Sequence, residues 1–587
     1  MDNSIKKKLH EQLAFLYGEE RAQNLTERVL FLLEAHHNLP VASENEVQTQ
    51  KFDEKDSILI TYGDIIQAPD HPGLQNLKNF LDDYLGDKIN SVHILPFFPY
   101  SSDDGFSVID YRKIDPKLGT WEDFRAMAKT KKIMVDMVIN HISRESRWFQ
   151  GFLQGDPRYQ DYFIHPDENW DLSKVVRPRT SPLLTEVETA SGPTKVWTTF
   201  SADQIDLNFA NPDVLIEIID ILLFYLRQGA SIIRLDAIAY LWKESGTTCI
   251  HLPETHSVIK LLRLVLEEVD PEVVLITETN VPHLENISYF GEFDPETGRT
   301  DEAHMVYQFP LAPLVLHTLI SGSAKHLADW VDGLESKGIF FNFIASHDGI
   351  GVLPAKGILR EDELQEVIDT VHRHGGLLSH RSNPDGSETV YELNTTLYDA
   401  LNDPASSDPP VDIERFLASQ VILISLAGVP GIYYHSLFGS RNAIDNVKKT
   451  GRARSINREK FELDALLALL EDPDNIHHQI FDQYRHLLSI RIDQPAFDPK
   501  AMQKVLRFDD RVFALERCAL DNSSSILTLV NISSEFVELT IDIDKSCLQG
   551  AQALVDLISK EYYYFDHQEL QLKLKPYQSM WLMNENS

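Results

Sequence analysis

The chain has 587 residues, more than one hydrophobic core usually serves, so several domains are expected. With 54 lysines and arginines against 90 aspartates and glutamates, the net charge of −36 excludes a nucleic-acid partner, whose phosphates would be repelled. The sequence has neither a secretory signal nor a run of about 18 apolar residues, and its three cysteines are too few for a disulfide framework, so we expect a cytoplasmic protein that makes no membrane contact.

The first segment, residues 1–55, is predicted to be helical. Asn24 or Thr26 is a possible start signal. Helical structure is expected to about residue 50. The residues that recur at helical spacing are Leu25, Val29, Leu32, Leu33 and His36. We expect a helical layer against the next domain; an arm that binds a partner is the alternative.

Eight short apolar runs follow, each suited in length to a buried strand. They cover residues 58–62, 92–95, 133–139, 231–235, 274–277, 305–309, 340–346 and 429–434. Between them lie segments with helical spacing, such as 74–85, 258–269, 416–426 and 481–490. Strands that alternate with helices predict a parallel sheet, and eight of them predict a (β/α)8, or TIM, barrel of the α/β class.

Other segments interrupt and extend the barrel, whose predicted parts are residues 56–141, 213–348 and 406–494. Residues 142–212 are too long for a simple loop and predict an inserted subdomain. Residues 349–405 predict a second insertion, with a helix over 363–372 and a glycine-rich loop over 382–394. From 495 to 587, short alternating runs separated by Asn, Asp and Ser predict an antiparallel β domain.

Polar side chains stand where four of the predicted strands end. They are Asn140 with His141, Asp236, Glu278, and His347 with Asp348. In a (β/α)8 barrel the catalytic groups come from the carboxyl ends of several strands. One polar residue at a strand end is more often merely solvated, but four such ends in one chain indicate an active site at that face.

These strand ends lie in the motifs DMVINH, IIRLDA, TETN and ASHD, which resemble the four motif regions of the α-amylase superfamily of glycoside hydrolases and transglycosylases. Further stretches resemble its sucrose phosphorylase group, and most nearly the glucosylglycerate phosphorylase members of that group. They are SSDDGFSVIDYRKIDPKLGTWEDF, RPR followed by PLLT, KESGTTC and ASHDGIG.

The resemblance implies cleavage of an α-glucosidic bond with retention, which needs a carboxylate nucleophile and a carboxyl proton donor about 5 to 5.5 Å apart. Asp236 is expected to be the nucleophile and Glu278 the general acid and base. Asp348 is expected to bind the 2- and 3-hydroxyls of the glucosyl unit. Arg234 lies two residues before Asp236, on the same strand face, and is expected to keep it ionised.

The remaining glucosyl contacts are also implied by the resemblance. Arg454 matches the family's arginine partner of Asp103, with Arg452 as the alternative. Phe106 matches an aromatic platform. The other residues expected to bind the sugar are His141, Tyr240 and His347.

The acceptor end must bind phosphate in spite of the overall negative charge, so locally concentrated cations are expected there. Arg179, with Arg177 beside it in the RPR stretch, is expected to bind phosphate or an anionic acceptor because a guanidinium matches oxyanion geometry. Asn280, Tyr391 and Glu392 are expected to line the same end.

This end also departs from the sucrose phosphorylase pattern. Val176 replaces a tyrosine, Glu392 replaces a glutamine, Asn280 replaces a histidine, and Glu388, Thr389 and Val390 replace a Leu-Asp-Leu segment. These changes spare the glucosyl side and favour 2-O-α-glucosylglycerate over sucrose. The alternatives are phosphorolysis of sucrose, sucrose 6-phosphate or glucosylglycerol, hydrolysis of an α-glucoside, and a catalytically silent barrel that acts as a scaffold.

The resemblance implies no cofactor and no metal. Asn140 stands where calcium-binding amylases place a ligand, but the phosphorylase group does without the ion. The expected partners are therefore a small glucoside and inorganic phosphate, and a homodimer is possible on the same analogy.

Overall fold

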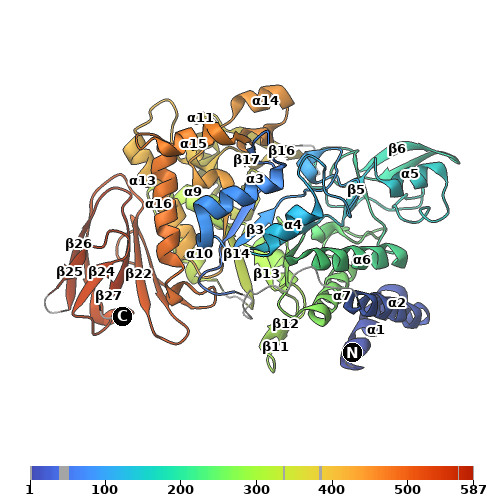
Figure 1. The fold of residues 1–587 in the computed structure, drawn as a ribbon, viewed down its shortest axis with the longest axis horizontal. Coiled ribbons are helices and arrows are strands. Elements are labelled where there is room, and N and C mark those ends of the chain that lie inside the picture. Colours follow the sequence, from blue (N-terminus) through green and yellow to red (C-terminus); the bar gives the residue numbers. More distant parts are fainter. Residues whose placement is uncertain (1–2, 39–51, 335–336, 383–386, 566–567, 586–587) are drawn as a thin grey trace.

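The computed structural model describes residues 3–38, 52–334, 337–382, 387–565 and 568–585. At its centre is a closed barrel of eight parallel strands (Figure 1). They are β1 (Ile58–Thr61), β3 (Ser91–Ile94), β4 (Lys132–Met137), β9 (Ala230–Leu235), β10 (Val274–Thr277), β13 (Met305–Tyr307), β14 (Ile339–Phe343) and β18 (Val429–Tyr433). Neighbours in the barrel follow chain order, and β18 closes against β1, so the predicted TIM barrel is confirmed.

The strands are apolar because both of their faces are covered. Every residue of β1, β3 and β10 is buried. Side chains fill the barrel inside, and helices cover it outside. The main outer helices are α3 (Gly73–Phe80), α4 (Trp121–Ala128), α6 (Pro212–Gln228), α7 (Pro253–Val269), α9 (Leu311–Ser321), α10 (Lys325–Asp332), α13 (Pro409–Ser425) and α16 (Ile476–Arg491).

Two helices precede the barrel, α1 (Asn3–Tyr17) and α2 (Glu19–His37), and they pack on α7 and α6. The chain turns between them at Gly18, whose φ of 82° suits a residue without a side chain. The predicted start at Asn24 or Thr26 is wrong, because both lie inside α2. Thr26 is buried there, and its hydroxyl donates to the Ala22 carbonyl at 2.8 Å. The rest of the predicted helix, residues 39–51, lies outside the described residues.

The insertion after β4 contains β5 (His141–Ser143), α5 (Arg147–Gln154), β6 (Leu184–Thr189), β7 (Gly192–Trp197) and β8 (Gln204–Asp206). β5 pairs with β8, and β6 with β7. The barrel strand ends at Met137, earlier than predicted, so His141 opens a strand of the insertion instead of following a barrel strand directly. Trp170 and Trp197 pack in a small apolar cluster of this insertion.

The insertion after β14 contains β15 (Ile350–Gly351), α11 (Glu361–Arg373), β16 (Leu377–Ser382) and β17 (Glu388–Asn394), which form a three-stranded sheet with β17 in the middle. The glycine-rich loop predicted over 382–394 is therefore wrong for its second half, which is strand. The sequence TVYELN there has the β-branched and aromatic residues that favour strands, and it pairs with β16. Residues 383–386 lie outside the described part.

The C-terminal strands form an antiparallel sheet in the order β20 (Met502–Leu506), β21 (Val512–Cys518), β22 (Ser525–Asn531), β27 (Ser579–Asn584), β24 (Ala553–Asp556) and β25 (Tyr562–Tyr564), with β23 (Val537–Asp542) and β26 (Glu569–Leu574) as a separate pair. Figure 1 shows these strands on the side of the barrel opposite to α1 and α2. Over the described ranges, none of the helices combines the length and apolar character needed to cross a lipid bilayer.

Candidate active site

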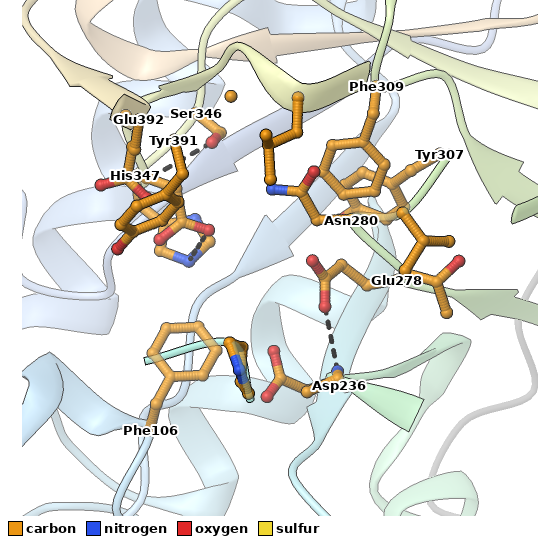
Figure 2. Close-up of a pocket in the computed structure, with 18 of the residues that line it drawn as sticks. Phe106, Asp236, Glu278, Asn280, Tyr307, Phe309, Ser346, His347, Tyr391 and Glu392 are labelled. Carbon is orange, nitrogen blue, oxygen red and sulfur yellow. Dashed lines mark hydrogen bonds and ion pairs between the residues drawn. The ribbon is translucent and has the colours of Figure 1, made fainter. Parts of the chain in front are cut away.

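A pocket opens at the carboxyl ends of the barrel strands, where both insertions meet the barrel. Its lining combines the residues that follow β9, β10 and β14 with residues of the insertions. Fourteen of the fifteen residues predicted for the site line it: Asp103, Phe106, His141, Arg179, Arg234, Asp236, Tyr240, Glu278, Asn280, His347, Asp348, Tyr391, Glu392 and Arg454. Arg177 is the one that does not. Figure 2 shows the carboxyl groups of Asp236 and Glu278 turned toward the same space.

Asp236 follows the last residue of β9, and Arg234 holds its carboxylate. Arg234 Nη1 donates to Asp236 Oδ1 at 2.7 Å and also bonds to Asp136 on β4. Asp136 in turn lies 2.8 Å from His93 Nε2, and both side chains are fully buried. Burial raises the pKa of Asp236, and the Arg234 guanidinium opposes that rise. Arg234 therefore fixes the orientation of the carboxylate and offsets its desolvation.

Glu278 follows β10, the strand next to β9. Its Oε2 accepts the Ala237 N–H at 2.9 Å and lies 3.8 Å from Arg234 Nη2. Ala237 has a φ of 48°, a conformation rare for residues with a side chain, which presents that N–H to the glutamate. Burial, with the nearby charges of Asp236 and Asp348, raises the pKa of Glu278 to about 7. A carboxyl group with this pKa can both give and take a proton near neutral pH.

Asp348 lies beyond the end of β14, in contact with two arginines. Arg454 Nη1 is 2.5 Å from Asp348 Oδ1, and Arg458 Nη2 is 3.7 Å away. Burial would raise the pKa of Asp348, but Arg454, with His347 and Arg458, brings it well below its usual range. Arg454 also makes two hydrogen bonds to Glu392, at 2.9 and 2.6 Å.

The partners of Arg454 thus differ from the expected Asp103. Asp103 contributes to the field on Arg454, but the guanidinium forms its ion pairs with Asp348 and Glu392. Asp104 is paired with Arg458 at 2.6 Å and lies 3.9 Å from Arg452. The physical reason is that β17 carries Glu392 to the guanidinium that also pairs with Asp348.

Gly349 is what allows this close approach. A Cβ at that position would lie 2.6 Å from both the Leu393 carbonyl oxygen and Glu392 Cγ. A larger residue there would therefore push β17, and with it Glu392, away from Asp348.

Aromatic and histidine side chains also line the pocket. Phe106 and His347 stack, with ring centroids 5.0 Å apart and planes within 7°. Burial lowers the pKa of His347 to about 3, so its imidazole is neutral near pH 7. Gln204, which the sequence did not single out, bonds to the Phe106 carbonyl and lies 3.2 Å from His141 Nε2. Tyr240 packs edge-on against Phe200.

The residues expected to bind the acceptor include a cation, Arg179. Arg179 hydrogen-bonds to the Tyr391 hydroxyl, and its guanidinium lies 5.5 Å from the centre of that ring. Arg177 is exposed, and its guanidinium donates to the Ser181 carbonyl of the same loop. The two predicted arginines therefore point to different places. Asn280 packs against Gly351. Arg381 also lines this pocket, and no sequence pattern had indicated it.

The ammonium group of Lys243 lies beside Asn140, the residue that matches a calcium ligand of calcium-binding amylases. Lys243 Nζ is 2.8 Å from Asn140 Oδ1 and 2.5 Å from Asp206 Oδ2, and all three side chains are buried. The ammonium group supplies the positive charge that these oxygens need. Within the described ranges, no group of three or more His, Cys, Asp or Glu side chains is placed to hold a metal ion.

Two site residues that the sequence analysis did not name lie close to motifs that it used. Arg458 is the third arginine of RARSINR, and Lys243 lies seven residues after Asp236. Their partners come from segments far away in the chain, however, and local spacing carries no signal for such pairs. Arg381 directly precedes the segment predicted to be a loop.

Comparison with known proteins gives the same assignment as the motifs. Residues 76–352 match the family described as the alpha-amylase catalytic domain. The chain is similar to a glucosylglycerate phosphorylase of Spirochaeta thermophila, with 46% identity over 586 residues that cover 98% of both chains. A glucosylglycerate phosphorylase of Allomeiothermus silvanus is 49% identical over 508 residues, 86% of this chain and 88% of the relative.

A solved structure agrees with this result. The sucrose 6F-phosphate phosphorylase from Thermoanaerobacter thermosaccharolyticum superposes with a TM-score of 0.71 at 25% identity, over 91% of this chain and 100% of that one. The family resemblance seen in the motifs is therefore confirmed. The chain belongs to the α-amylase family, within its group of glucosylglycerate phosphorylases.

Proposed function

We propose that this protein phosphorolyses 2-O-α-glucosylglycerate, converting it with inorganic phosphate to α-D-glucose 1-phosphate and D-glycerate. The observation that carries the proposal is the identity of 46% across 98% of both chains with a relative named for this activity. The pocket supports it, since the acids Asp236, Glu278 and Asp348 line it together with the cations Arg179 and Arg381.

In the first half-reaction Asp236 attacks C1 of the glucosyl unit, and the bond from C1 to the glycerate oxygen breaks. Glu278 gives its proton to that departing oxygen. Its pKa of about 7 leaves a large share of it protonated at neutral pH. Asp348, kept ionised by Arg454, accepts hydrogen bonds from the sugar hydroxyls, which strengthen as positive charge develops on the ring.

In the second half-reaction a phosphate oxygen attacks C1 and releases Asp236. Glu278 takes the proton of the attacking phosphate. Its pKa falls at this stage, because the charge of Asp236 that helped to raise it is neutralised in the glucosyl-enzyme. Phosphate, rather than water, is selected by the positive charge of Arg179 at the acceptor end.

The test supplies glucose 1-phosphate with glycerate, glycerol, fructose or fructose 6-phosphate and measures the phosphate released. Release with glycerate well above that with the other three is the expected result. Preference for another acceptor would move the function to the corresponding relative. Release with none of them would refute a phosphorylase.

We place the reaction in a reducing cytoplasm. All three cysteines, Cys249, Cys518 and Cys547, are free thiols. Disulfides would be expected to form and persist in an oxidising compartment.

A further inference from the structure

The arginines of the pocket divide by what neutralises them. Arg234 is paired with Asp136 and Asp236, and Arg454 with Asp348 and Glu392. The partner of Arg179 is the neutral hydroxyl of Tyr391. Among the residues that the structure describes, none pairs a carboxylate with this guanidinium, which is a marked local exception in a chain with a net charge of −36.

Arg381 is the second such cation. It lies on β16, opposite Thr389 of β17 and just after the irregularity at Ser379 and His380. Its side chain is partly buried and lines the pocket. The Nε atom is buried, and it has no hydrogen-bond partner among the residues that the structure describes. An unsatisfied buried donor on a charged group is costly, so a ligand that accepts its hydrogen bond would bind with a gain.

The guanidinium groups of Arg179 and Arg381 line the same pocket. Arg179 and Arg381 each lower the pKa of Tyr240 against the larger rise that burial causes. Both act from the same pocket, on the side where Tyr391 also stands. Their positive charges thus meet at the acceptor end, away from the paired arginines of the glucosyl end.

The stereochemistry of the reaction defines which ligands must bind at the acceptor end. With retention, the leaving group departs from, and the second nucleophile enters at, the same face of C1. The glycerate carboxylate and the phosphate therefore occupy the same space at different times. We propose that Arg381 is the second cationic ligand of a single anion site, which with Arg179 receives in turn the carboxylate of glycerate and inorganic phosphate. This inference rests on the proposed function and extends it to a residue.

The experiment forms the glucosyl-enzyme from α-glucosyl fluoride, a donor without charge, and measures how it is partitioned among added acceptors. For each acceptor the readout is the concentration that diverts half of the glucosyl-enzyme away from water. The variants are Arg381→Gln and the control Arg373→Gln, which removes an exposed arginine of α11 in the same insertion.

In Arg381→Gln, the half-diverting concentrations of both phosphate and glycerate should rise about 10- to 100-fold, the effect of one charge-assisted hydrogen bond. That for glycerol, which has no charge, should shift far less. Arg381→Lys should recover part of the loss, and Arg373→Gln should behave as the wild type does.

The outcomes separate this inference from the proposed function. A wild-type glucosyl-enzyme that glycerate does not divert would refute glycerate as the acceptor. A wild type that both anions divert, with Arg381→Gln indistinguishable from it, would refute the role of Arg381. A rise for one anion only would overturn the single shared site.

Discussion

Replacing Glu278 by glutamine should abolish the proposed activity and yet stabilise the fold at alkaline pH. Its carboxyl group is buried, and its pKa is raised from 4.5 to about 7. Because the folded-state pKa exceeds the unfolded one, its contribution to stability is fully present below pH 4.5 and is lost as the pH rises from 4.5 to about 7. Glutamine keeps the shape and cannot ionise.

The magnitude follows from the two pKa values. At about 1.4 kcal/mol for each pH unit, their difference corresponds to about 3 kcal/mol. The variant should therefore unfold at nearly the same temperature as the wild type near pH 4.5, and at a temperature higher by a few degrees at about pH 8. Thermal unfolding across this pH range measures the difference.

Glu272→Gln is the control, since Glu272 is an exposed residue just before the same strand. It should show a Tm difference that does not depend on pH in this range. A difference for Glu278→Gln that stayed constant or shrank as the pH rose would refute the reasoning, because it would mean that the carboxyl group is not destabilised by ionising.

Four further predictions concern the site. The kcat/KM for the glucosyl donor should fall above about pH 7, as Glu278 loses its proton, and a pH profile that stays flat to about pH 9 would contradict this. Asp236→Asn should lower kcat by about 10⁴-fold or more while circular dichroism remains that of the wild type. Lys243→Met should leave Asp206 buried without its cation and destabilise the fold by about 3 to 5 kcal/mol, whereas Lys448→Met, at an exposed position, should change Tm little. Activity should be unchanged after dialysis against a chelator, because the ammonium of Lys243 occupies the place beside Asn140; loss of activity restored by calcium would overturn that reading.

The barrel and the places of Asp236 and Glu278 in it were predictable because their signals are local. A buried parallel strand is a short apolar run, and the polar residue that ends it must lie at the carboxyl edge. Asp236 and Glu278 each follow such a run directly, on strands that are neighbours in both chain order and space. The alternation of eight strands with helices then indicated a closed barrel of parallel strands.

The partners of the charged side chains depended on the tertiary structure. Whether Arg454 meets Asp103, or instead Asp348 and Glu392, is decided by where the hairpin of β16 and β17 lies against the barrel. The same hairpin carries Arg381 into the pocket.

From the sequence alone, short apolar runs indicated the barrel, and the polar residues that end them placed Asp236 and Glu278 at one face of it. The contact of Arg234 with Asp236 was also predictable, because the two lie two residues apart on one strand. The partners of Arg454 and Arg458 were settled only by folding, because these ion pairs join residues 62 to 354 positions apart and their energy falls off within a few ångströms, so that spacing along the chain holds no record of them.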